Sequence, residues 1–228
     1  LDVSAFKISS SDLTNHPFLE YVASKKKPII ISTGLSTSND VHSAVKLFVN
    51  KKLKNKIALL QATSDYPTPN HDVNLRVISS YKNKYKIPVG LSDHTQNNVA
   101  SLGAIALGAS ILEKHFTLSQ NMPGPDQKSS LEPDELFQWI KEIRIMEKSL
   151  GSTKKFITKS EEQNLTMRKV IAVKPINKGQ KITKNLILSM RGNKHGILPT
   201  NNNLKKIIGK TVNKNIVKPT QFSWNLLC

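Results

Sequence analysis

Cysteine is almost absent from this chain of 228 residues: the only one is Cys228, at the last position. An internal disulfide framework is therefore excluded. The composition fits a reducing compartment, so we expect a cytoplasmic protein. No apolar run approaches the roughly 18 residues of a membrane span. The opening LDVSAFKISS has neither the basic nor the apolar region of a signal peptide, so the sequence predicts none.

Acidic residues are also scarce. Lys and Arg number 34 against 16 Asp and Glu, a net charge of +18, and residues 151–228 carry +14 of it. Such a basic segment can bind nucleic acid, an anionic membrane or an acidic subunit. The lysines are scattered, however, and aromatic residues make up only 6% of the chain, which leaves few rings for base stacking. We interpret the lysines as a solvated surface and expect neither a nucleic-acid nor a membrane partner.

The first 150 residues show a regular alternation of β-rich and helical segments. This spacing predicts βα units around a parallel sheet. Apolar runs such as PIII fit strands that are covered on both faces. A further helix, with Pro133 near its start, ends at Gly151. The predicted strands are 4–9, 27–33, 56–63, 87–93 and 109–116, and the helices between them are 13–24, 39–50, 74–82 and 96–107.

The composition and periodicity of the sequence change after Gly151. Residues 152–168 are polar and aperiodic, which predicts a linker. From Lys169 the pattern is short strand, turn at Gly179 and short strand, which predicts a small all-β module near the lower size limit for folding alone. The predicted domains are therefore 1–151 and 169–228.

Each predicted strand ends in polar residues. In open α/β sheets and in (β/α)₈ barrels, the site lies at the carboxyl ends of the strands. Residues i and i+2 share a face, so Ser92 points with His94, and Glu113 points with His115. If these strands are neighbours, two imidazoles meet and can hold a divalent metal. The alternative is that each histidine is a hydrogen-bonded structural residue.

Hydroxyl groups gather at the same predicted edge. Ser10, Ser32 and Ser92, with Lys7, are suited to binding a phosphate beside a helix N-terminus. The alternative is that these residues only cap helices. The loop NMPGPDQKSSLEP presents Asp126, either to a site or simply as part of a turn.

Six motifs occur in one order along the chain. Together they resemble the N-acetylneuraminate (sialic acid) synthase family, including its legionaminate and pseudaminate synthase relatives. Residues 169–228 are similar to the C-terminal antifreeze-like (SAF, β-clip) domain of that family. The motifs are FKISSSD, PIIISTG, ATSDYPTP, GLSDHT, EKHFTL and PGPDQKSSLEPDEL.

The resemblance implies an α/β fold: the C-terminal portion of a (β/α)₈ TIM barrel followed by a small all-β SAF domain, in a homodimer formed by domain swapping. It implies an enzyme that condenses phosphoenolpyruvate with an N-acetylated sugar aldehyde, N-acetylmannosamine or a related diacetamido hexose. The products are a nonulosonic (sialic-type) acid and phosphate. A non-catalytic carbohydrate-binding protein that carries a SAF module is the alternative.

The resemblance also implies roles for individual residues. Catalysis falls to Lys7 and Asp12, and Asp12 stands where many members have Glu. A divalent metal, Mn²⁺ or Mg²⁺, is held by His94 and His115. The sugar is contacted by Tyr66, Asp126 and Arg191, the last inserted from the partner subunit. Phosphoenolpyruvate is bound by Lys7, Ser10, Ser32, Ser64 and Ser92.

The sequence departs from the family pattern at several points. Gln61 and Ala62 replace a frequent His-Cys pair, and some members have Asn at the position of Ser64. No proline follows Arg191. The family also has a stretch before FKISS that supplies strands and site residues, so we expect the chain to be a fragment that is inactive alone.

Overall fold

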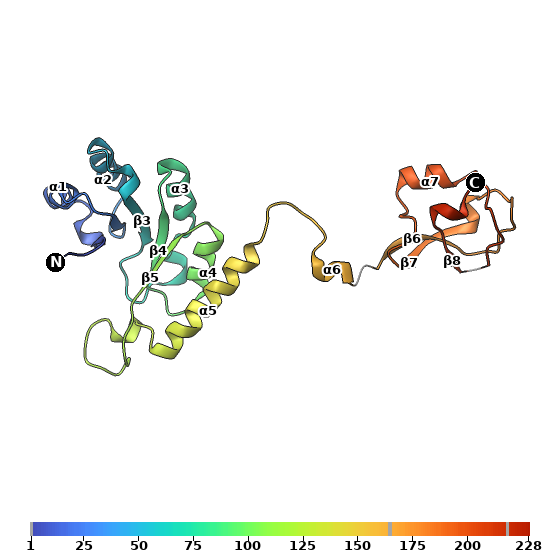
Figure 1. The fold of residues 1–228 in the computed structure, drawn as a ribbon. Coiled ribbons are helices and arrows are strands. Elements are labelled where there is room, and N and C mark those ends of the chain that lie inside the picture. The colour runs from blue at the N-terminus through green and yellow to red at the C-terminus, as the bar shows by residue number, and fades with distance from the viewer. Residues whose placement is uncertain (1, 164–165, 218) are drawn as a thin grey trace. The chain divides into compact units, whose positions relative to one another are not determined.

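The computed structural model describes residues 2–163, 166–217 and 219–228 (Figure 1). The chain divides into two compact units, Leu1–Ser152 and Thr153–Cys228. Each unit buries its own apolar core. Within the described residues, no helix is long and apolar enough to cross a membrane.

The first unit is built on a parallel sheet in which the strand order follows the chain order, β1-β2-β3-β4-β5. All five carboxyl ends therefore lie along one edge of the sheet. The predicted alternation of strands and helices is confirmed, although each strand is shorter than predicted. The strands are β1 (Phe6–Ile8), β2 (Ile29–Ser32), β3 (Ile57–Ala62), β4 (Val89–Asp93) and β5 (Ile111–Lys114).

A helix connects each strand to the next and a further helix follows β5, and each of these helices buries one apolar face. In α2, for example, Val41, Ala44 and Phe48 are fully buried. This helix begins with a capping box, in which Thr37 and Asp40 bond each other's backbone N–H groups. The helices are α1 (His16–Ser24), α2 (Ser38–Asn50), α3 (Arg76–Tyr85), α4 (Val99–Ala106) and α5 (Pro133–Leu150).

The register of β4 and β5 determines which side chains at the carboxyl ends of these strands share a face of the sheet. Ser92 pairs with Glu113, and Asp93 pairs with Lys114. Because side chains alternate along a strand, the first pair faces one side of the sheet and the second pair faces the other. The two strands approach closely at Gly90, where an added Cβ would lie 2.1 Å from the carbonyl oxygen of Ile111.

The second unit contains an antiparallel sheet of order β7-β6-β8, formed by β6 (Met167–Ala172), β7 (Ile187–Gly192) and β8 (Thr220–Gln221). The prediction of an all-β module is wrong in one respect, because α7 (Asn201–Ile207) is helical. Thr200 caps this helix by accepting from the N–H of Asn203. The run of Asn residues at its start has low helix propensity and hid the helix from the sequence pattern.

The predicted linker 152–168 is not wholly irregular. It contains the short helix α6 (Lys159–Gln163), and β6 begins at Met167, inside the predicted linker. The Thr158 hydroxyl accepts from the N–H of Glu161, and the Glu161 carboxylate accepts from the N–H of Thr158. This reciprocal cap starts a helix that the polar composition did not indicate.

Candidate active site

Two histidine rings lie side by side at the carboxyl edge of the parallel sheet. His94 follows β4 and His115 follows β5, and their ring centroids are 5.3 Å apart in an edge-to-face arrangement. The two strands are hydrogen-bonded neighbours. The imidazoles thus meet as the i and i+2 spacing predicts.

The tautomer of His94 follows from its backbone partner. Its Nδ1 lies 2.7 Å from the carbonyl oxygen of Thr63. A carbonyl can only accept a hydrogen bond, so Nδ1 carries the hydrogen, and Nε2 of the neutral ring keeps its lone pair. Burial lowers the pKa of His94, and the neighbouring His115 lowers it further. The ring is therefore held in the neutral form that can donate electrons to a cation.

A polar network links β1, β2, β4 and β5 beside these rings. Ser92 Oγ donates to Glu113 Oε1 at 2.6 Å. Glu113 Oε2 lies 3.5 Å from Lys7 Nζ, which donates to Ser32 Oγ at 2.8 Å. Because the Ser92 hydroxyl has given its one hydrogen to Glu113, its 3.3 Å contact with His94 Nε2 leaves that lone pair unfilled. Glu113 was not among the predicted site residues, although its i+2 spacing from His115 could have indicated it.

Ser10 and Ser64 converge on Gly34. The Gly34 N–H donates to Ser10 Oγ at 2.9 Å. A Cβ added at Gly34 would lie 2.3 Å from Ser64 Oγ and 2.8 Å from Ser10 Oγ. Only a residue without a side chain leaves this cradle open, and its two hydroxyls suit an oxyanion. Gly34 was also missed, because the sequence does not show which hydroxyls surround it.

Tyr66 and Asp126 lie at the rim of the histidine pair. The Tyr66 ring centroid is 4.3 Å from that of His94 and 5.3 Å from that of His115. Asp126 Oδ2 lies 3.9 Å from His115 Nδ1. Burial raises the pKa of Tyr66, and the carboxylates of Asp126 and Glu113 raise it further. Tyr66 therefore remains a neutral phenol that can donate a hydrogen bond.

Asp12 and Arg191 make no described contact with the histidine pair, with its polar network or with the cradle at Gly34. Asp12 ends a single turn of 3₁₀ helix, where its carboxylate accepts from Ser9 Oγ at 3.0 Å and from Asn15 Nδ2 at 3.4 Å. Arg191 lies on β7 of the second unit and is exposed. The roles of Asp12 and Arg191 stay predictions.

The histidine pair fits a divalent metal with two protein ligands. One imidazole nitrogen has an unfilled lone pair, and the second ring lies in contact with the first. Across the described residues, no group of three or more His, Cys, Asp or Glu side chains surrounds one point. Water and substrate oxygens would therefore complete the coordination of an ion held here.

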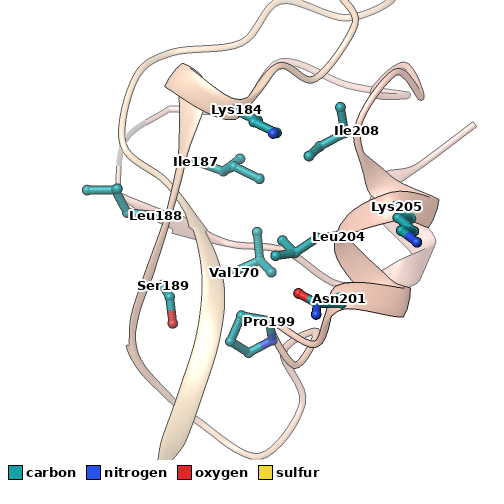
Figure 2. Close-up of a pocket in the computed structure, with 10 residues that line it drawn as sticks. All are labelled: Val170, Lys184, Ile187, Leu188, Ser189, Pro199, Asn201, Leu204, Lys205 and Ile208. Atoms are coloured by element: carbon teal, nitrogen blue, oxygen red, sulfur yellow. The ribbon is translucent and has the colours of Figure 1, made fainter.

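A separate cavity lies in the second unit, between β7 and α7 (Figure 2). Its volume is about 620 Å³. Neither histidine nor carboxylate lines it, so it has no counterpart of the histidine pair or of Glu113. Its lining residues are Val170, Lys184, Ile187, Leu188, Ser189, Pro199, Asn201, Leu204, Lys205 and Ile208.

Comparison with known proteins identifies relatives of the chain. Residues 1–155 match the model of the NeuB family. The chain is 42% identical to the N,N'-diacetyllegionaminic acid synthase of Campylobacter jejuni, over 79% of this chain and 55% of that protein. It is 36% identical to the N-acetylneuraminate-9-phosphate synthase of Homo sapiens, over 93% of this chain and 59% of that protein. The chain thus spans little more than half the length of these relatives.

Solved structures show the same fold. A sialic acid synthetase from Leptospira borgpetersenii, in complex with citrate, superposes with a TM-score of 0.66 at 36% identity, over 72% of this chain and 56% of that chain. A putative spore coat polysaccharide biosynthesis protein E from Chromobacterium violaceum gives a TM-score of 0.72 at 22% identity, over 99% of this chain and 68% of that chain. The first unit is an α/β half-barrel, consistent with part of a TIM barrel.

Proposed function

The chain belongs to the NeuB family, and from this premise we propose that it is part of a synthase that makes a nonulosonic (sialic-type) acid. Named relatives make legionaminic acid, pseudaminic acid and N-acetylneuraminate 9-phosphate. The proposed reaction joins phosphoenolpyruvate to the aldehyde of N-acetylmannosamine or a related diacetamido hexose. A carbon–carbon bond forms, water adds, and phosphate leaves.

One observation carries this proposal. The histidine pair lies at the same edge of the sheet as the ammonium group of Lys7 and the hydroxyls of Ser32 and Ser92. As the new carbon–carbon bond forms, the aldehyde oxygen becomes an alkoxide. His94 and His115 would hold a divalent ion, and that ion would supply Lewis acidity where the negative charge develops. The lone pair on His94 Nε2 and the neutral state of its ring favour this role.

The second substrate carries phosphate and carboxylate groups. Lys7 supplies a positive charge at this edge, and the hydroxyls of Ser32 and Ser92 lie within the same network. The cradle of Ser10, Gly34 and Ser64 adds two hydroxyls at a second point. A hydrogen bond that involves a charged group is stronger than one between two neutral groups. The edge is therefore suited to the anionic phosphoenolpyruvate.

The remaining residues would handle the sugar and the protons. Tyr66, as a neutral phenol next to both rings, would donate to a sugar oxygen, and Asp126 would accept from a sugar hydroxyl. Glu113 balances the charge of Lys7 and orients the Ser92 hydroxyl. Asp12 would take the proton of the attacking water, and Arg191 would come from the second unit of a partner in a domain-swapped homodimer.

The proposal is tested by ³¹P NMR of phosphoenolpyruvate in the presence of Mn²⁺ and the chain. We expect paramagnetic broadening of the phosphate signal with the unchanged chain, and none beyond free Mn²⁺ with the double variant His94→Ala, His115→Ala. The control is His16→Ala, His71→Ala, which removes two exposed rings. Equal broadening by both variants would contradict the proposal. Sugar binding that persists without both site histidines would favour the carbohydrate-binding alternative.

A further inference from the structure

A fully buried ion pair joins the two residues that precede the histidines in the chain. Lys114 Nζ is 3.1 Å from Asp93 Oδ2, and their side chains are 1% and 0% exposed. Asp93 immediately precedes His94, and Lys114 immediately precedes His115. Because the strands alternate faces, the ion pair lies on the opposite side of the sheet from Ser92 and Glu113.

The hydrogen-bonding groups of this pair are extensively used. Asp93 Oδ1 accepts from the N–H of Thr95 at 2.9 Å and from its hydroxyl at 2.8 Å. Asp93 Oδ2 accepts from Ser101 Oγ at 2.6 Å. Lys114 Nζ also donates to the carbonyl of Thr95 at 2.7 Å and, at 3.4 Å, to that of Asn97. The pair thus ties the end of β5 to the end of β4, to the loop that follows it and to α4.

Such a pair is not explained by stability alone. Removing two charges from water costs about as much as their attraction returns, so apolar residues would serve a core equally well. Their burial also excludes direct contact with a substrate. What the pair does provide is a fixed position for the ends of β4 and β5, which carry the two rings.

We propose that Asp93 and Lys114 are positioning residues that set the spacing of His94 and His115. The metal-binding consequence rests on the proposed function, whereas the positioning itself does not. Residues that orient metal ligands typically change metal affinity by about 10- to 100-fold when they are removed, and the ion pair would act on the rings through the strand ends that carry them. The ion pair therefore determines how tightly the two imidazoles hold a divalent cation.

The test uses the double variant Asp93→Asn, Lys114→Met in the full chain. Both replacements nearly preserve volume, and Asn can still accept from Thr95, so the main loss is the ammonium group between the two strands. We expect the affinity for Mn²⁺, measured by electron paramagnetic resonance of the free ion, to fall at least about tenfold. The matched control is Asp2→Asn, Lys27→Met, which removes a more exposed ion pair and should leave the affinity unchanged.

A metal-free measurement separates this inference from the proposed function. In the unchanged chain the Nδ1 proton of His94, bonded to Thr63, should exchange slowly with water and give an observable NMR signal. In the double variant we expect that signal to broaden or disappear, and the contacts between the two rings to weaken. If the unchanged chain bound no Mn²⁺, the metal assignment would fail, and the ring signals alone would decide the positioning role.

The inference is overturned if the double variant is folded, keeps the ring signals and binds Mn²⁺ within twofold of the unchanged chain. If the double variant does not fold, Ser101→Ala replaces it, since this change removes one hydrogen bond to Asp93 and leaves both charges in place. We then expect a smaller loss of affinity than in the double variant, because only one of the bonds that hold Asp93 is removed. An unchanged affinity and unchanged ring signals in Ser101→Ala would equally overturn the inference.

Discussion

At the scale of single residues, His94 shows how one backbone carbonyl determines what a side chain can do. The Thr63 carbonyl fixes the hydrogen on Nδ1, and burial keeps the ring neutral. Neither effect is visible in the sequence, because Thr63 belongs to a different strand–loop junction. The sequence predicted that the two histidines meet, but not which nitrogen of His94 faces the site.

The lowered pKa of His94 makes stability depend on pH. Below about 6.5, the ordinary pKa of histidine, the unfolded chain takes up a proton that the folded chain excludes. This contribution to stability is complete above that pH and is lost progressively as the pH falls toward the lower, folded pKa. We expect the free energy of unfolding in EDTA to fall between pH 7 and 5.5, and to fall less in His94→Gln. His71→Gln, which changes an exposed ring, should keep the original slope.

The buried ion pair gives a second prediction at this scale. Lys114→Met leaves the Asp93 carboxylate buried without its partner, so we expect it to destabilise the first unit by about 3–5 kcal/mol. Lys27→Met, at a more exposed pair, should cost less than about 1 kcal/mol. The measurement is urea unfolding followed by the fluorescence of Trp139, with Trp224 replaced by Phe. Equal costs for the two changes would contradict the structural account.

At the scale of elements, the close approach of β4 and β5 depends on Gly90. An added Cβ would meet the carbonyl of Ile111 at 2.1 Å and Leu60 Cδ2 at 2.7 Å, and the backbone carbonyl cannot move aside alone. We expect Gly90→Ala to destabilise the first unit by about 1–3 kcal/mol and to shift the ring signals of His115. Gly103→Ala meets only the flexible end of Leu75 and should be nearly neutral. A neutral Gly90→Ala would show that the two strands separate without cost.

The elements themselves were largely predictable, for a physical reason. Strands covered on both faces give continuous apolar runs, and amphipathic helices give periodic ones, so the order of the first unit follows from composition along the chain. The helices α6 and α7 were missed because both are short and polar at their starts. The register between neighbouring strands was harder to predict. That Asp93 faces Lys114 across the sheet, while Ser92 faces Glu113, depends on pairing between strands that are distant in sequence.

At the scale of the whole molecule, the two units are joined by an exposed segment. Residues 153–158 belong to no helix or strand and are exposed. We expect limited trypsin digestion to cut there first, at Lys154 or Lys155, and to leave two fragments that retain circular dichroism of folded protein. The measurement is mass spectrometry of the early products. Early cuts within β3 or β4 would contradict the division into units.

The span of the chain gives the last prediction. Because it covers little more than half the length of its relatives, the proposed synthase would need residues from outside it. We expect the 228-residue chain to release no phosphate from phosphoenolpyruvate with N-acetylmannosamine and Mn²⁺. Phosphate release that requires both site histidines would show that the half-barrel is sufficient for catalysis.

The burial of Asp93 and Lys114 also determines how the site responds to salt. Dissolved ions screen charges that face water, within a distance of about 8 Å at physiological ionic strength, but they do not penetrate a packed interior. The lysines of the second unit will therefore lose their attraction for anions as sodium chloride is added. Dissolved salt does not reach the buried charges of Asp93 and Lys114. We therefore expect the spacing of the two imidazoles to be the same at low and at high salt concentration.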